Sequence, residues 1–395
     1  KMKKNNYLTV IDFGSSELRL GVFDNKLSKL FFQSTDISHK DNYEEYSKSI
    51  NFLIREAEKK ISSHLENATV MYDTPKMFTI DISIKKKLDK KIIFKDVCSS
   101  IVLEANQLIK DSYTDKKIIH SIIKKYIING KEYLNIPDNI TELDYVILEI
   151  IFICLPKKQY KDVFETFKKN NIKILNFFSS SLVKSFKYIE FFKEDKFVAF
   201  LDIGFDKTTI IYFINQKLDY LNSLPIGGNH ISKDISQIMK LSLEDSEKLK
   251  KTFNKSETDF SYNNTDSNNN IEIVKKIIGK NISIDLLKKV VLSRVEEIID
   301  LSFKNTNIFK NIDEQQKLNL VLIGNGSKIF NKNSFQIKDK YKFKEINFYE
   351  ENNLEICEAG ISFEKKIIEE DLQKNKKNHK KIGFFHRFFN IFGNG

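Results

Sequence analysis

Apolar residues along the chain occur in short runs and at helical spacing, which together predict an α/β fold. Residues 197–201 form an unbroken apolar run, and apolar stretches follow at 208–213 and 218–224 across short polar turns. Unbroken runs of this length are typical of strands buried on both faces of a sheet. The apolar positions of 231–239 then recur every three or four residues, as in an amphipathic helix. This part of the chain therefore predicts three strands followed by a helix.

The same pattern occurs near the start of the sequence, where 7–12 predicts another buried strand. Both this strand and the one at 197–201 lead into an Asp-x-Gly turn, at Asp12 and at Asp202. Such a turn can present backbone N–H groups to a phosphate and a carboxylate to its metal. Asp and Gly also occupy tight turns for conformational reasons, so a single copy is weak evidence. Two copies, 190 positions apart, predict duplicated halves that face each other across a cleft.

The remaining pattern alternates helices and strands. Helices are predicted at 43–65, 94–109, 160–170, 243–253 and 284–303, with one more ending at 192, and strands at 17–23, 70–73, 77–84, 118–130, 145–155, 173–177 and 318–323. Segment 77–156 differs in texture from its surroundings and predicts a small α/β subdomain inserted into the first half. Residues 254–270 are rich in Asn and Ser and predict a flexible loop.

The charge of the chain changes this picture little. A net charge of +11 would ordinarily suggest nucleic acid or an anionic membrane as a partner. Lys greatly outnumbers Arg, and Asn, Ile and Phe are abundant, as in proteins encoded by AT-rich genes. No nucleic-acid recognition motif accompanies the lysines, so no nucleic-acid partner is expected. Cys98, Cys154 and Cys357 are far apart, which indicates a reducing compartment, and neither a signal sequence nor a membrane-spanning apolar run is visible.

The stretch 382–392 has an unusual concentration of Phe. In a helix, one half of its surface would carry Ile382, Phe384, Phe385, Phe388, Phe389, Ile391 and Phe392. The Lys-rich stretch 374–381 precedes it and predicts a basic tether too polar to fold by itself. Docking on the body of the protein or on a partner is one explanation. A membrane surface is favoured, because each buried Phe contributes roughly 1.5–3 kcal/mol and each nearby Lys about 1 kcal/mol on an anionic leaflet.

Three features together look like the nucleotide site of the actin superfamily. They are the two Asp-x-Gly turns, a helix with an acidic and a basic residue three positions apart, and a late strand that runs into a glycine turn at 324–327. Within this superfamily, the block SLPIGGNHISKDI at 223–235, followed by LSLEDSEKLK at 241–250, closely resembles the bacterial cell-division FtsA family. The location of the inserted segment at 77–156 is also similar to that family.

The resemblance implies an actin-like (ribonuclease H-like) two-lobed fold with duplicated sheets, an inserted small α/β subdomain and a C-terminal amphipathic helix. The implied boundaries are 1–76 and 157–195, completed by about 345–368, for the first lobe; 77–156 for the insertion; 196–232 and 303–344 for the core of the second lobe; 233–302 for its smaller subdomain; 369–381 for a basic linker; and 382–395 for a membrane-targeting helix.

The resemblance also implies that ATP and Mg²⁺ lie between the lobes. Asp12 and Asp202 would orient the metal, largely through water. The phosphates would be wrapped by Gly14, Ser15, Ser16, Gly204, Lys207 and Thr208, the ribose and base edge would be reached by Glu247 and Lys250, and the adenosine would lie along Gly324, Asn325, Gly326 and Ser327. An exposed ion pair on a helix would explain Glu247 and Lys250 equally well.

The sequence departs from the family pattern in three places. Many FtsA chains carry Lys where this one has Glu17, and Arg19, on the same strand face, is the candidate replacement for its charge. The second turn lacks two of its usual glycines and gains Asp206, which makes a close approach to phosphate harder. Some relatives carry an acidic residue near Asn176 that orders the attacking water. We therefore expect ATP binding with weak or absent hydrolysis, and no catalytic residue.

The function implied by the resemblance is that of a cell-division adaptor. It would self-assemble into filaments and tether FtsZ filaments to the cytoplasmic face of the inner membrane at the septum. The FtsZ C-terminal peptide is expected on 233–302, where Arg294 is a candidate contact, and the insertion would face other division proteins or neighbouring subunits. A PilM-like pilus adaptor shares the Asp-x-Gly and PIGG features and stays an alternative, as does, with less support, a sugar or acyl kinase on the same fold.

Overall fold

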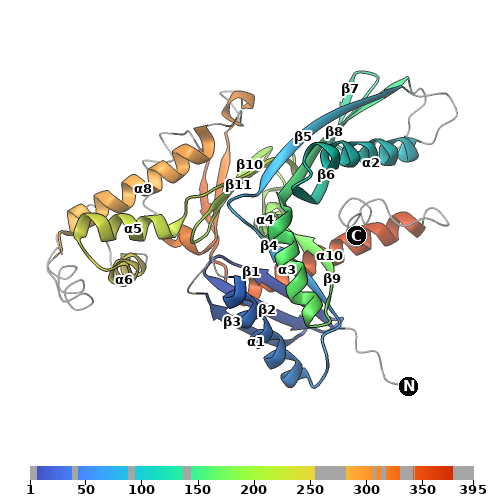
Figure 1. Ribbon diagram of the computed structural model, residues 1–395. Helices are drawn as coiled ribbons and strands as arrows, with labels where there is room; N and C mark the ends of the chain where they lie inside the picture. The colour runs from blue at the N-terminus through green and yellow to red at the C-terminus, as the bar shows by residue number, and fades with distance from the viewer. Residues whose placement is uncertain are drawn as a thin grey trace. The chain divides into compact units, whose positions relative to one another are not determined.

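The computed structural model in Figure 1 describes most of the chain. The described residues are 7–37, 43–87, 94–136, 144–253, 282–304, 306, 308–312, 317–329, 341 and 343–376. The chain divides into two compact units, one formed by Lys1–Glu194, Phe213–Asn222 and Asn352–Gly395, the other by Asp195–Tyr212 and Ser223–Glu351. The finer subdomain boundaries implied by the sequence stay predictions.

The first unit contains a five-stranded sheet in the order β3-β2-β1-β4-β9. Its strands are β1 (Leu8–Phe13), β2 (Glu17–Phe23), β3 (Lys29–Asp36), β4 (Asn67–Tyr72) and β9 (Lys173–Phe178). Strand β2 is antiparallel to β1 and β3, whereas β1, β4 and β9 are parallel. The carboxyl ends of the three parallel strands therefore share one edge of the sheet, and Asp12 stands at that edge.

Helices cover both faces of this sheet. Helices α1 (Tyr43–Ile61) and α3 (Lys157–Lys169) pack on the face that carries Phe13, whose ring lies 6.5 Å from that of Tyr46 and 6.2 Å from that of Phe167. Helix α10 (Asn353–Lys376) packs on β1, β2 and on α4 (Ser180–Tyr188), which continues into the short helix η1 (Ile189–Phe192). Both faces are thus buried, as the apolar runs predict.

The predicted insertion forms an antiparallel four-stranded sheet in the order β5-β8-β6-β7. Its strands are β5 (Phe78–Lys87), β6 (Lys116–Ile128), β7 (Lys131–Tyr133) and β8 (Tyr145–Pro156), and α2 (Phe94–Ser112) lies along one face of the sheet (Figure 1). Asn129 and Gly130 both have positive φ, 49° and 83°, which is the geometry of a tight hairpin turn. The predicted strand–helix–strand pattern is present.

A second five-stranded sheet repeats the strand arrangement of the first. It has the order β12-β11-β10-β13-β14, with β10 (Phe197–Ile203), β11 (Thr208–Ile214), β12 (Lys217–Leu224), β13 (Asn319–Ile323) and β14 (Ile346–Phe348). In both sheets the third, second, first, fourth and fifth strands of the set are neighbours in that order. The duplication predicted from the two Asp-x-Gly turns is therefore confirmed at the level of topology.

In the described part of the second unit, three α-helices follow β12 along the chain. They are α5 (Gly228–Met239), α6 (Leu243–Phe253) and α8 (Ile284–Lys304), and α5 packs against both of the others (Figure 1). The 3-10 turns η2 (Ile308–Asn311) and η3 (Asn325–Ile329) flank β13. Among the described residues no helix is long and apolar enough to cross a membrane.

Helix α10 differs from the sequence expectation. It continues to Lys376 and so includes the first residues of the stretch expected as a basic linker at 369–381, and part of the tether expected at 374–381. Adding a residue to an existing helix costs far less than nucleating one, so the packed half around Cys357 and Phe363 lets the polar half follow. Residues 377–381 and the predicted membrane helix at 382–395 lie outside the described residues.

Candidate functional site

The Asp12 side chain, at the end of β1, already has partners for both of its oxygens. Arg19 Nη1 donates to Oδ2 at 2.8 Å, and Ser180 Oγ donates to Oδ1 at 2.6 Å. The Asp12 and Arg19 side chains are only 3% and 7% exposed, so water screens this ion pair weakly. The first Asp-x-Gly turn is therefore closed by protein groups.

Arg19, on β2, is held by three acceptors. Besides Asp12, it donates from Nη2 to Glu17 at 2.8 Å and from Nε to Asn353, the first residue of α10, at 2.8 Å. Burial lowers the Arg19 pKa, but the negative charges of Asp12 and Glu17 outweigh that effect and raise it above its ordinary value. The guanidinium is thus permanently charged, and the two carboxylates that it pairs with more than neutralise it. Asn353 also donates to Glu17.

The turn at Gly14, Ser15 and Ser16 lies directly against this arginine. A Cβ atom on Gly14 would stand 2.8 Å from Arg19 Nη1 and 2.6 Å from the carbonyl oxygen of Glu17, so the turn needs glycine. The Ser16 carbonyl accepts a bond from the backbone of Ile37 at 2.9 Å. The predicted residues of the first unit, Asp12, Gly14 and Arg19, are therefore in contact with one another.

The start of α4 contributes a group of residues that sequence reasoning missed. Ser180, which holds Asp12, lies between Ser179 and Ser181, and Asp73 accepts from both of these: from Ser179 Oγ at 2.7 Å and from the Ser181 backbone N–H at 2.8 Å. His120 Nε2 of β6 accepts from the Ser179 backbone N–H at 2.8 Å, and burial lowers the pKa of His120 to about 3. A run of three serines before an apolar helix is the N-cap signal that could have identified this start.

In the second unit the turn after β10 is closed by backbone hydrogen bonds. Gly204 N–H donates to the Lys207 carbonyl at 2.8 Å, and two N–H groups at the start of α5, of Gly228 and Asn229, donate to the carbonyls of Gly204 and Phe205 at 2.9 and 2.7 Å. Gly326, in η3, lies against the same turn. The structure thus brings together the predicted glycine turns at 204 and 324–327, and adds the start of α5.

Polar side chains beside this turn are occupied within the protein. Thr208 is fully buried and its hydroxyl donates to the Ile226 carbonyl at 2.7 Å, while Lys207 Nζ lies 3.2 Å from Thr209 Oγ1. Asp206 accepts from the Asn229 amide at 3.1 Å, which ties the added negative charge to α5. Asp206, which stands in place of one of the usual glycines, is therefore integrated into the local structure.

Glu247 and Lys250 of α6 form an ion pair that is buried on the lysine side. Lys250 Nζ lies 2.6 Å from Glu247 Oε2 and donates to the Gly228 carbonyl at 2.9 Å, and its side chain is 8% exposed. Burial lowers the pKa of Lys250 against the effect of Glu247. The pKa of Glu247 is also lowered: burial would raise it, but bonds from Lys250 and Ser232 prevail. An exposed helical pair is therefore the wrong description, and Lys250 joins α6 to the start of α5.

The glycine turn at 324–327 has one exposed and one buried polar side chain. Asn325 is exposed, whereas Ser327 is buried and its hydroxyl donates to the Gly324 carbonyl at 2.7 Å. Gly324 has φ of 84° and lies so close to Asp202 that a Cβ there would overlap the carboxylate. The side chain of Asp202 thus lies over this turn.

Two other residues singled out from the sequence have structural partners. Arg294 of α8 makes a bidentate pair with Asp234 of α5, at 2.5 and 2.8 Å, and a third bond to Glu297. Asn176 of β9 donates to Glu364 of α10 at 2.8 Å, deep in the first unit. Both side chains join neighbouring elements.

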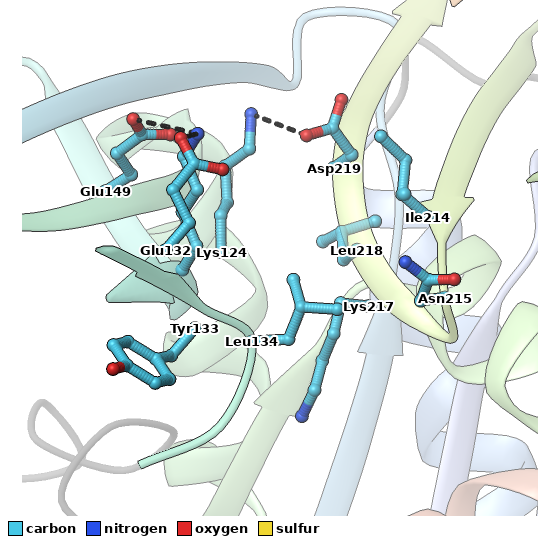
Figure 2. A pocket seen from close by; sticks show the side chains of 11 residues that line it. Lys124, Glu132, Tyr133, Leu134, Glu149, Ile214, Asn215, Lys217, Leu218 and Asp219 are labelled. Carbon is cyan, nitrogen blue, oxygen red and sulfur yellow. Dashed lines mark hydrogen bonds and ion pairs between the residues drawn. The ribbon is translucent and has the colours of Figure 1, made fainter. Parts of the chain in front are cut away.

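The first unit also contains a cavity of about 340 Å³, between the inserted sheet and residues 214–219 (Figure 2). Its charged walls are paired: Lys124 contacts Asp219 at 3.2 Å, and Lys125 contacts Glu132 at 2.8 Å and Glu149 at 3.4 Å. None of the nucleotide-site residues predicted from the sequence lines this cavity.

The hydrogen-bond partners of Asp12 show whether its carboxylate could help to bind Mg²⁺, as the resemblance implies. Asp12 has both oxygens engaged, one of them by a cationic guanidinium. Within the described part of the chain, no three His, Cys, Asp or Glu side chains are grouped so that they could hold a metal ion. The surroundings of Asp12 therefore do not fit a bound Mg²⁺.

Comparison with known proteins identifies the relationship of the chain. The family model of cell division protein FtsA matches residues 199–336, the part that holds both glycine turns and α5, α6 and α8. This part of the chain is similar to the FtsA family. FtsA of Streptococcus pneumoniae is 21% identical over 60% of this chain, and FtsA of Bacillus subtilis is 27% identical over 41%. These matches span 50% and 36% of the two FtsA proteins, about half or less of their length.

Solved structures show that the chain has the actin-like ATPase fold. The PilM-PilN type IV pilus biogenesis complex is similar with a TM-score of 0.58 at 14% identity, covering 89% of this chain and 90% of that one. MreB5 of Spiroplasma citri is similar in its ADP-bound form, with a TM-score of 0.50 at 12% identity over 95% of this chain and 100% of that one. Its AMPPNP-bound form is similar with a TM-score of 0.51 at 11% identity, covering 94% of this chain and 100% of that one. The predicted fold class is confirmed.

Proposed function

We propose that this chain binds ATP. The observation that supports this most directly is the packing of the turn at Gly204, the start of α5, Gly326 and Lys250 into one group, inside the region that matches the FtsA family. Glycine turns at strand ends let a ligand approach the backbone closely, as a phosphate must. The similar MreB5 structures are bound to ADP and AMPPNP. In this proposal Ser15, Ser16, Thr208, Glu247 and the turn at 324–327 lie near the nucleotide, as the family resemblance implies.

Titration with a fluorescent ATP analogue tests this proposal. We expect saturable binding that unlabelled ATP displaces and that Lys250→Ala weakens, since Lys250 holds α6 to the turn. Lys248→Ala is the matched control, because Lys248 lies on the same helix, is largely exposed and pairs with Glu244. Absence of binding even at millimolar nucleotide would remove the proposal.

We propose that hydrolysis is weak or absent. Asn176 stands where some relatives have an acidic residue, and its amide is committed to Glu364 and Thr69. No carboxylate is thus available from that position to order an attacking water. A phosphate-release assay should give no turnover above that of a Lys250→Ala control.

We further propose that the chain acts as an adaptor of bacterial cell division, at the cytoplasmic face of the membrane. Filaments of the chain would hold FtsZ filaments through the FtsZ C-terminal peptide, and residues 382–392 would bind an anionic membrane surface. The FtsA relationship supports the division partners, and the phenylalanine-rich sequence of 382–392 supports the membrane contact. Many weak contacts along a filament sum to firm attachment.

Arg294 gives the FtsZ proposal a specific test on 233–302. Its guanidinium is held by Asp234 and Glu297, so a peptide carboxylate would have to share it. We expect Arg294→Ala to weaken capture of the FtsZ C-terminal peptide, and the exposed Arg55→Ala on α1 to leave it unchanged. Equal capture by both variants would remove Arg294 from the contact.

A pilus adaptor is the second candidate, because the PilM-PilN complex shares the fold over nearly the whole chain. The sequence of 382–392 favours the division adaptor. Pull-downs with an FtsZ C-terminal peptide and with a PilN-type peptide separate the two, and binding of the second peptide alone would favour the pilus adaptor.

A further inference from the structure

A metal-dependent nucleotide site needs a carboxylate that is free to face the cation. In this chain Arg19 occupies the carboxylate of Asp12. Its Nη1 atom donates to Asp12 Oδ2 at 2.8 Å, and the two side chains are almost completely buried. Ser180 donates to the other Asp12 oxygen at 2.6 Å. Asp12 is thus neutralised by the protein before any ligand binds.

A divalent cation would have to compete with this arrangement. Bonds between a guanidinium and a carboxylate are charge-assisted and are roughly twice as strong as neutral hydrogen bonds. A cation that approached Asp12 would also be repelled by the Arg19 charge, which the surroundings screen weakly. Arg19 cannot relieve this repulsion by losing its proton, since its pKa is raised.

The guanidinium is also in contact with the turn predicted to hold phosphate. The Cα of Gly14 lies against it so closely that a Cβ would stand 2.8 Å from Nη1. Asn353 at the start of α10 and Glu17 on β2 fix the other nitrogens. The positive charge is therefore held in one place by three different parts of the first unit.

We propose that Arg19 replaces the divalent cation at Asp12, so that this chain binds adenine nucleotide without magnesium. The inference rests on the proposed ATP binding and concerns its cation requirement. The Arg19 guanidinium occupies the place of that cation beside Asp12 and beneath the Gly14 turn, and Asp12 holds it there and does not bind a metal.

The test is an ATP titration of the full chain by calorimetry, in excess magnesium and in EDTA. For the unaltered chain we expect dissociation constants that agree within about threefold in the two buffers. Arg19→Gln removes the charge and should weaken binding in EDTA by at least about tenfold, with partial recovery in magnesium because Asp12 is released. Arg19→Lys keeps a charge but loses the fork of donors. Its ATP affinity in EDTA should lie between that of the unaltered chain and that of Arg19→Gln. Arg55→Ala, an exposed arginine of the same unit, is the matched control.

The outcomes separate this inference from the proposed function. If the unaltered chain loses about tenfold or more of its affinity in EDTA, the inference is overturned while ATP binding stands. If it binds in neither buffer, the proposed function is refuted and the inference with it. Thermal unfolding of each variant without nucleotide shows whether it is folded, and if Arg19→Gln does not fold, the comparison of buffers on the unaltered chain still decides.

Discussion

Substitution of Gly326 by Ala tests the close packing of the glycine turns in the second unit. A Cβ atom at this position would stand 2.7 Å from the Ile203 carbonyl oxygen and 2.8 Å from that of Gly204. Real Cβ atoms essentially never come so close, and both neighbours are backbone, so neither can rotate away. Overpacking of this kind costs typically 1–3 kcal/mol. We expect Gly326→Ala to lower the free energy of unfolding by about 2 kcal/mol or more.

Gly228 provides a matched control within the same group. A Cβ there would be 3.5 Å from Lys250 Nζ and 3.6 Å from Gly326 Cα, which is ordinary van der Waals contact. Gly228 is the first residue of α5 and does not have a left-handed backbone. Gly228→Ala should therefore be neutral, or should stabilise by about 0.4–1 kcal/mol by restricting the unfolded chain.

Urea unfolding followed by circular dichroism measures both variants, and the ATP titration reports the effect on binding. We expect loss of stability and of ATP affinity for Gly326→Ala, because the turn at 203–204 must move. Equal stabilities for the two variants would refute the packing argument. Loss of affinity in Gly228→Ala with unchanged stability would show instead that the ligand approaches Gly228 directly.

Three further predictions concern buried polar groups and the tail. Burial raises the pKa of Glu364, against bonds from Thr69 and Asn176 that lower it. Its contribution to stability is therefore fully present below its pKa in the unfolded chain, about 4.3. The contribution is lost as the pH rises through its pKa in the folded chain. Glu364→Gln should gain stability relative to the unaltered chain as the pH rises above about 4.3 in urea unfolding, and a constant difference would contradict this. Asp73→Ala removes a buried acceptor of bonds from Ser179 and Ser181 and should lower the unfolding free energy by about 3 kcal/mol, measured in the same way; a loss below about 1 kcal/mol would show that α4 does not depend on it. Deletion of 382–395 should abolish sedimentation with anionic liposomes, and continued pelleting would refute the membrane assignment.

The sequence predicted elements with strong patterns well. The buried strands around Asp12 and Asp202, the main strands and the helix within 77–156, and the helix at 243–253 all form where the sequence pattern placed them. Short or partly exposed elements were missed: β3 has a mixed surface pattern, and β7 and β14 have three residues each. Their pairing depends on neighbouring strands and not on their own residues.

The candidate site was predictable as a set of positions but not as a set of contacts. Asp12 and Arg19 are adjacent in the register of β1 and β2, so their pairing could have been inferred once the hairpin was assumed. The contacts of Ser180 with Asp12 and of Asn353 with Arg19 could not have been inferred. These residues are 168 and 334 positions apart in the sequence, and no local pattern links them. Long-range contacts of this kind depend on how α4 and α10 pack on the sheet.

Recruitment of FtsZ to lipid tests the central proposal most directly. FtsZ is sedimented with anionic liposomes in the presence of ATP and of either the full chain or the chain lacking 382–395. We predict that FtsZ pellets with the full chain and stays in the supernatant with the truncated one. FtsZ that stays in the supernatant while the full chain itself pellets would contradict the proposed role as a membrane adaptor for FtsZ.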